Sequence, residues 1–145
     1  MARRQSANEN SLAWEMAVNE QDILDLADRF ITGVQAGDQE GVRACYAPDA
    51  VIWHNFDGVE QTVDQNMRSL RWFARTLPDR RYRILRREAI KDGFMQQHVL
   101  EATLPDGTAW AMPACVVVTV KDGLIARLDE YLDSAHAAVL QTIGR

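Results

Sequence analysis

Three Asp-Gly turns in the second half of this chain constrain its fold more than any other feature. They are Asp92-Gly93, Asp106-Gly107 and Asp122-Gly123. Each lies between runs rich in β-branched and aromatic residues, where a tight hairpin turn needs positive φ angles. The turns predict four consecutive strands, over residues 81–90, 94–104, 108–120 and 124–132. The second half of the chain is therefore expected to form an antiparallel meander, onto which the earlier residues pack.

The first third of the chain is predicted to be helical after a flexible start. Residues 1–18 are polar with little periodicity, which favours a frayed N-terminal tail. From Asn19, apolar residues recur at helical spacing until Gly37, and Asn19 is the expected N-cap of this helix. Asp38 is expected to cap a second, short helix.

One strand and two further helices complete the predicted order of elements. The strand covers residues 50–55, and Thr62 follows as the cap of a third helix, which Pro78 ends. Ser134 is expected to cap a last helix after the meander. Helices gathered before a mainly antiparallel sheet must cover one of its faces, so the predicted fold class is α+β, in a single domain over residues 19–145.

Composition narrows the class of protein. The chain has 145 residues, 47% of them hydrophobic and 26% charged, and no apolar run approaches a membrane span. No secretory signal follows the basic residues 1–5, so we expect a soluble, cytoplasmic protein. The net charge of −5 argues against a nucleic-acid partner. Cys45 and Cys115 lack CxxC spacing and are expected to be free thiols. Eight arginines between residues 68 and 87 suggest a solvated face or, alternatively, an anion or partner site.

Several short motifs resemble the superfamily of nuclear transport factor 2, ketosteroid isomerase and SnoaL-type cyclases. They are Ala36-Gly37-Asp38, the Tyr-Ala-Pro-Asp-Ala approach to residue 50, Trp53-His54-Asn55, and Asp129-Glu130-Tyr131-Leu132-Asp133. The resemblance implies a cone-shaped α+β barrel with a pocket between a curved sheet and the helices. It also implies cofactor-free chemistry and a homodimer formed through the sheet's outer surface.

Four residues are candidates for catalysis: His54, His98, Glu130 and Asn55. By resemblance, His54 lies where ketosteroid isomerases have a general base, and Glu130 lies where SnoaL-type cyclases have their acid. Asn55 matches an asparagine of limonene-epoxide hydrolases, and His54 with His98 could supply the two pocket histidines of scytalone dehydratase. Independently of resemblance, imidazole and a buried carboxylate can exchange protons near neutral pH. Alternation along the strand favours Glu130 over Asp129 as the inward residue.

Aromatic side chains are candidates for the walls of a ligand pocket, although core packing alone is the favoured explanation for the three tryptophans among them. They are Phe30, Trp53, Trp72, Trp110 and Tyr131. Phe30 falls where ketosteroid isomerases have an oxyanion-hole tyrosine, so that hydroxyl is missing here. A metal triad of two histidines and a carboxylate is disfavoured because no close ligand spacing supports it.

The sequence thus predicts a cofactor-independent acid–base enzyme that acts on a small, apolar, ring-containing molecule. The reaction would be an isomerisation, cyclisation, dehydration or epoxide hydration. His54 would be the main base, His98 and Glu130 would assist it, and Asn55 would orient a substrate oxygen or a water molecule by donating a hydrogen bond. A non-catalytic binding or dimerisation module of the same fold is the alternative, because fold does not imply function.

Overall fold

The computed structural model describes residues 2–143, except for the side chains of residues 2–8, 10 and 13–18. In chain order its elements are α1 (Ala2–Ala36), α2 (Gln39–Cys45), β1 (Tyr46–His54), β2 (Glu60–Gln61), α3 (Val63–Thr76), β3 (Arg81–Ile90), β4 (Gly93–Thr103), β5 (Ala109–Lys121), β6 (Leu124–Leu132) and α4 (Ser134–Gln141).

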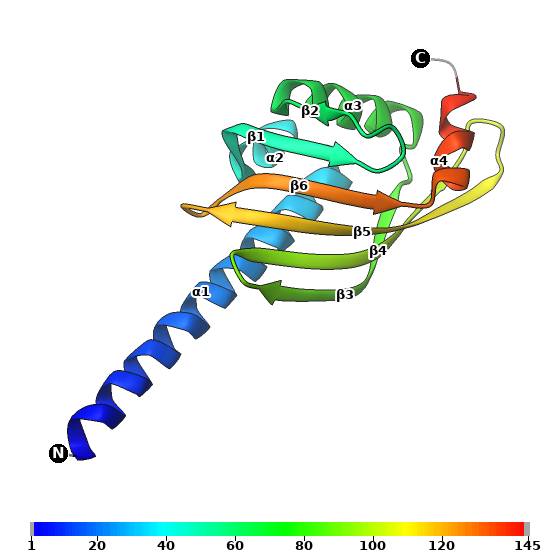
Figure 1. Ribbon diagram of the computed structural model, residues 1–145. Coiled ribbons are helices and arrows are strands. Elements are labelled where there is room, and N and C mark those ends of the chain that lie inside the picture. The colour runs from blue at the N-terminus through cyan, green and yellow to red at the C-terminus, as the bar shows by residue number, and fades with distance from the viewer. Residues whose placement is uncertain (1, 144–145) are drawn as a thin grey trace.

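The fold is α+β, as predicted, and is built on one curved six-stranded sheet (Figure 1). The strand order is β2-β1-β6-β5-β4-β3. All neighbouring strands are antiparallel except β1 and β6, which pair in parallel. α1 crosses one face of this sheet and contacts β3 and β4, while α3 contacts β1. We call this covered side the inner face and the opposite side the outer face.

The four-strand meander is confirmed, and its turns have the predicted chemistry. Asp92 and Asp122 adopt φ angles of 60° and 52°, and Gly107 and Gly123 adopt 87° and 76°. Gly93 is needed for a different reason: a Cβ atom there would collide with the backbone of Val118 on the neighbouring strand. These positions explain why the strand boundaries lie within two residues of those expected from the sequence.

Two predicted helix caps are wrong. α1 begins at Ala2, so Asn19 lies inside the helix rather than at its N-terminus, because residues 2–18 include many good helix formers despite their weak periodicity. The expected tail is thus helical in its backbone, and its flexibility stays a prediction. The cap of α4 is Asp133 rather than Ser134, since its carboxylate accepts hydrogen bonds from the N–H groups of Ala135 and His136. The Asp38 and Thr62 caps are confirmed.

The first strand is longer than predicted and has a small partner. β1 begins at Tyr46, and its register against β6 shifts between Tyr46 and Val51, where Pro48 cannot donate a ladder hydrogen bond. β2, which the sequence analysis missed, is only a two-residue pairing with β1. Among the described residues, no helix is both long and apolar enough to cross a membrane.

Two groups of buried apolar side chains lie on the inner face. The first joins α1 and α3 to β1, β4, β5 and β6, and includes Leu26, Phe30 and Ile52. The second gathers around α4 and includes Leu77, Leu100 and Trp110. Tyr82 packs against both groups. The space between the two groups is where the candidate site lies.

Candidate active site

An internal cavity of about 130 Å³ separates the two apolar groups. Apolar members of both form most of its wall, among them Phe30, Leu100, Met112 and Leu128. Seven polar side chains interrupt this wall: Tyr46, His54, Asn66, Ser69, Tyr82, His98 and Glu130. An apolar chamber with a few convergent polar groups is typical of a small-molecule site.

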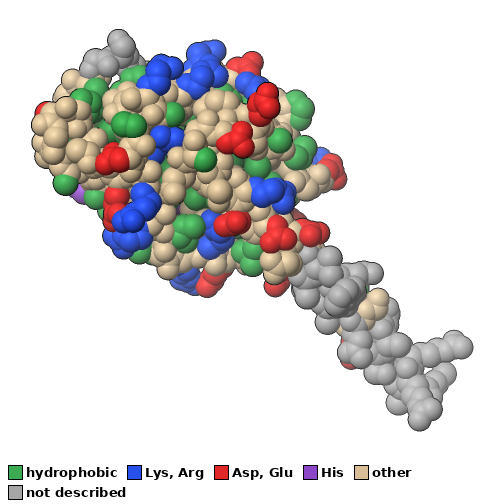
Figure 2. All heavy atoms as spheres, turned by 180° about the vertical axis from the view of Figure 1, so that it is seen from behind, with side chains coloured by type: hydrophobic (Ala, Val, Ile, Leu, Met, Phe, Trp, Pro, Cys, Tyr) green, Lys and Arg blue, Asp and Glu red, His purple; other side chains and the backbone are tan. Residues whose placement is uncertain are grey.

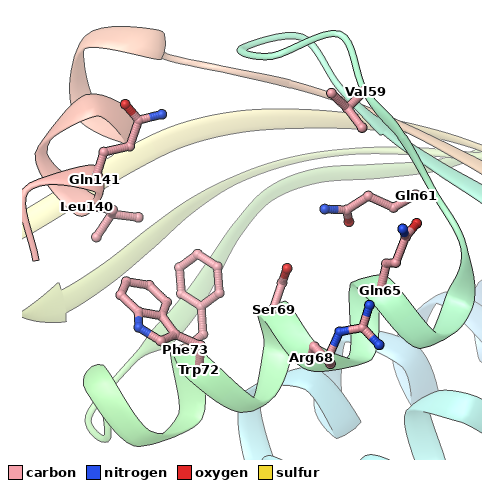
Figure 3. Close-up of a pocket in the computed structure, with 9 residues that line it drawn as sticks. All are labelled: Val59, Gln61, Gln65, Arg68, Ser69, Trp72, Phe73, Leu140 and Gln141. Atoms are coloured by element: carbon pink, nitrogen blue, oxygen red, sulfur yellow. The ribbon is translucent and has the colours of Figure 1, made fainter. Parts of the chain in front are cut away.

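A wider hollow of about 450 Å³ adjoins the cavity between α3, α4 and the segment from Val59 to Gln61. Figure 3 shows Ser69 and Phe73 on α3 facing this hollow, with Leu140 on α4 beyond them. These three residues also line the inner cavity. The outer hollow is therefore the natural approach to the cavity.

His54 and Glu130 meet at the inner cavity because β1 and β6 pair in parallel with these two residues opposite each other. His54 Nε2 lies 3.6 Å from Glu130 Oε1, and the side chains are only 17% and 19% exposed. Burial raises the pKa of Glu130, and the neighbouring His54 opposes that rise. The raised pKa brings the carboxyl group closer to the pH range in which it can both accept and return a proton.

The question of which acid faces inward is settled by the same register. Asp129 does not line the cavity, and it accepts a hydrogen bond from Arg127 Nε at 3.0 Å. Glu130 lines the cavity together with Leu128, as alternation along the strand predicts.

His98 lies on β4 and is 2% exposed. Its Nδ1 lies 2.9 Å from Gln96 Nε2, and the ring of Tyr82 packs edge-on against it with centroids 5.2 Å apart. Burial, assisted by the positive charge of Arg87, lowers the pKa of His98 to about 4. The ring is therefore neutral at cellular pH.

Two tyrosines that the sequence analysis did not select also line the cavity. Tyr46 donates a hydrogen bond to Asn66 Oδ1 at 3.0 Å, and its ring packs edge-on against Phe30 at 5.4 Å. Burial, followed by the nearby Glu130, raises the pKa of both Tyr46 and Tyr82, so both hydroxyls keep their protons. Alternation could have revealed Tyr82, which lies opposite Leu100 on the face that carries His98. No comparable signal marks Tyr46, because a register shift separates it from the rest of β1.

Asn55, predicted to orient a substrate, is engaged elsewhere. Its Oδ1 accepts a hydrogen bond from the Leu132 N–H at 2.9 Å, and its Nδ2 donates to the Leu132 carbonyl at 3.2 Å. Asn55 is not among the residues that line the cavity. The amide ties the end of β1 to the end of β6.

The predicted aromatic wall residues divide among four places. Phe30 lines the inner cavity and Trp72 lines the outer hollow. Trp110 is buried, and its indole N–H donates to the His136 carbonyl at 3.1 Å. Trp53 and Tyr131 pack against each other at 5.3 Å, outside both chambers, and Tyr131 is 52% exposed. The last three therefore do not line the cavity.

Charged side chains outside the cavity are largely balanced. Arg81 and Arg83 both pair with Glu101, and Arg86 pairs with Glu88. On the face that carries α1, basic and acidic side chains are also interspersed (Figure 2). The solvated interpretation of the arginine-rich segment fits these residues, whereas Arg80 and Arg87 point toward the interior and donate hydrogen bonds there. Within the described residues, no three His, Cys, Asp or Glu side chains gather as a metal site.

A family model described as a SnoaL-like domain matches residues 27–128. A search of curated proteins finds no match. Solved structures share the fold, consistent with a cone of the nuclear transport factor 2 type.

Three of these solved structures show the extent of the likeness. AclR of Streptomyces galilaeus, a candidate hydroxylase, is 14% identical with a TM-score of 0.74, covering 87% of this chain and 89% of its own. IdmH of Streptomyces antibioticus, a candidate polyketide cyclase, is 18% identical with a TM-score of 0.71, covering 82% and 97%. A candidate SnoaL-like polyketide cyclase of Shewanella denitrificans is 11% identical with a TM-score of 0.70, covering 83% and 97%.

Proposed function

This chain belongs to the SnoaL-like domain family of the nuclear transport factor 2-like superfamily, and we propose that it catalyses proton transfer on a small, largely apolar, ring-containing molecule without a cofactor. The observation that carries this proposal is the contact of 3.6 Å between His54 and Glu130 at an otherwise apolar cavity. Proton transfer needs a base of suitable pKa within reach of the substrate, and an apolar wall excludes the water that would compete.

In this proposal the two side chains of the pair act together. Glu130 takes a proton from a carbon or hydroxyl of the ligand and returns it at another position. Before the first transfer and after the second, His54 stabilises the carboxylate form of Glu130, because a positive or hydrogen-bonding neighbour favours the ionised form.

The size of the two chambers indicates the size of the substrate. An engineered apolar cavity of about 150 Å³ holds a benzene molecule, so an inner cavity of about 130 Å³ accommodates about one ring. A longer molecule would extend past Ser69, Phe73 and Leu140 into the outer hollow. This shape fits the end of a polyketide-like chain, and two of the compared structures are candidate polyketide cyclases.

The test is deuterium exchange next to a ring carbonyl, which needs proton transfer but not the natural substrate. We would incubate cyclohexanone and α-tetralone with the protein in D₂O and follow loss of the α-carbon proton signals by NMR. We expect the wild type to accelerate exchange, and Glu130→Gln to lower the accelerated rate by about 10²- to 10⁴-fold, the usual contribution of a general base.

The matched control is Asp129→Asn, which makes the same chemical change one residue away, at a side chain that bonds Arg127 instead of lining the cavity. It should keep the wild-type rate. If Glu130→Gln exchanges both ketones as fast as the wild type does, Glu130 is not the base and the proposal fails.

A further inference from the structure

Behind the cavity, three polar side chains form a hydrogen-bonded chain that the proton-transfer pair does not use. Arg87 Nε donates to Gln96 Oε1 at 2.8 Å, and Gln96 Nε2 lies 2.9 Å from His98 Nδ1. Gln96 is fully buried and His98 nearly so. Gln96 does not line the cavity, whereas His98 does.

The chemistry of arginine fixes the direction of every bond in this chain. A guanidinium group can only donate, so the Gln96 atom that faces it must be the carbonyl oxygen. The amide nitrogen of Gln96 then faces His98 and donates to Nδ1, which must be the unprotonated nitrogen of the ring. In a neutral imidazole the remaining proton lies on Nε2. His98 is consequently held as the Nε2–H tautomer.

Nε2 has no hydrogen-bond partner in the part of the chain that the structure describes. The edge contact with Tyr82 packs against the ring and restrains its orientation. His98 Nε2 is not among the described side-chain atoms that are both buried and without a partner, so it is accessible from the cavity, where a ligand that supplies an acceptor can bind it.

The sheet register places this donor away from the proton-transfer pair. Across β1, β6, β5 and β4, His54, Glu130, Val116 and Gln96 lie opposite one another in a single row on the inner face. Glu130 and Gln96 are thus two strand spacings apart, roughly 10 Å along the sheet, with the apolar Val116 between them. His98 lies one inward-facing position further along β4.

We propose that Arg87 and Gln96 hold His98 as a neutral Nε2–H donor that binds a carbonyl oxygen of the ligand, at the end of the cavity opposite the His54–Glu130 pair. The assignment of the ligand oxygen rests on the proposed function, whereas the tautomer does not. His98 is the binding residue, and Arg87 and Gln96 are positioning residues. A carbonyl is favoured because its oxygen only accepts, and because negative charge that develops on this oxygen during proton transfer strengthens the same hydrogen bond.

The first experiment determines the tautomer of His98 by two-bond ¹H–¹⁵N NMR correlation at neutral pH, with no ligand. We expect a protonated Nε2 and an unprotonated Nδ1 in the wild type. In Gln96→Glu, the new carboxylate accepts hydrogen bonds only, so Nδ1 should become protonated. Gln97→Glu, which changes the neighbouring exposed residue on the outer face of β4, should leave the wild-type pattern.

Substitutions at Arg87 keep the test decisive if Gln96→Glu does not fold. Arg87→Met removes the donor that orients the Gln96 amide, so His98 should become a mixture of tautomers. Arg87→Lys retains a donor and should restore the single Nε2–H form. The assignment would be overturned if His98 of the wild type carried its proton on Nδ1. It would also be overturned if none of the folded Gln96 or Arg87 variants changed which ring nitrogen of His98 is protonated.

The second experiment tests the ligand oxygen with two probes of nearly equal shape, cyclohexanone and methylenecyclohexane. We expect the wild type to bind the ketone about 3- to 10-fold more tightly, the ratio that one hydrogen bond supplies. The His98 Nε2–H resonance should move on addition of the ketone only. Equal affinities and an unmoved resonance would overturn the carbonyl assignment.

These results are independent of the deuterium-exchange rates. A fixed Nε2–H tautomer and ketone binding could persist in Glu130→Gln, in which proton transfer is lost. Conversely, if the deuterium-exchange rate is as expected but His98 is a mixture of tautomers in the wild type, the proposed function is retained and only this inference fails.

Discussion

At the scale of single residues, the surroundings of each polar group decide its protonation, and identical groups behave differently. Glu130 has its pKa raised by burial, whereas the exposed Glu101 has its pKa lowered by hydrogen bonds from Arg83 and Arg81. The sequence identifies these carboxylates, but it does not show which of them is buried or which receives hydrogen bonds. The depressed pKa of His98 is the residue-scale property with the clearest consequence for stability.

His98 should make the fold less stable as the pH falls. Its pKa is 6.5 in the unfolded chain and about 4 in the folded protein, so between these values the unfolded chain binds more protons. Stability should decrease from pH 6.5 toward pH 4, by up to about 3 kcal/mol from this group. Urea unfolding across that range should show a smaller decrease for His98→Gln than for the wild type.

The control for this prediction is His136→Gln, because His136 has a side chain 48% exposed. It should retain the wild-type pH dependence. An equal pH slope in His98→Gln and the wild type would mean that burial of His98 is not linked to folding in this way.

At the scale of secondary structure, the site depends on how the ends of strands are held together. The parallel pairing of β1 with β6 brings His54 beside Glu130. Asn55 closes that pairing through its two hydrogen bonds with the Leu132 backbone. Asn55 was expected to orient the substrate. In the structure it instead holds the ends of β1 and β6 together and does not line the cavity.

We therefore expect Asn55→Ala to act mainly on stability. Loss of the two hydrogen bonds should lower the free energy of unfolding by about 1–3 kcal/mol, measured by urea denaturation. Below the unfolding transition, the deuterium-exchange rate should fall far less than in Glu130→Gln. Asn19→Ala, an exposed change within α1, should have little effect on stability. An unchanged stability with a rate as low as that of Glu130→Gln would instead restore the catalytic role.

At the scale of the whole molecule, the helices cover the inner face of the sheet and leave much of the outer face open. Trp53 and Tyr131 pack together outside both chambers, and Val117 is 39% exposed on the strand between β4 and β6. Exposed aromatic and aliphatic groups on one face favour association with another protein surface. The homodimer suggested by family resemblance would use this outer face.

We predict a dimer at micromolar concentration by light scattering, and a monomer for Val117→Lys, because an ammonium group would be buried at the contact. The matched control is Val139→Lys on α4, where the valine is 38% exposed but lies away from the outer face. It should remain dimeric. A monomeric wild type, or dissociation of both variants alike, would contradict the predicted interface.

The sequence by itself determined the elements and the faces of their residues. The meander follows from Asp-Gly turns and β-branched runs, and the starts of α2 and α3 follow from Asp38 and Thr62, because φ angles, caps and alternation are local properties. Alternation also identified Glu130 as the inward acid. Where local signals were weak, as across residues 2–18 and at Pro48, the predicted boundaries failed.

Only the tertiary structure decided which of these residues meet. His54 and Glu130 are neighbours because two strands far apart in sequence pair in parallel, and no local rule fixes that register. The same arrangement brings Tyr46 and Tyr82 to the cavity and leaves Trp53, Trp110 and Tyr131 out of it. Which neighbours surround a side chain depends on how the curved sheet packs against the helices, and the packing of the whole chain sets that curvature.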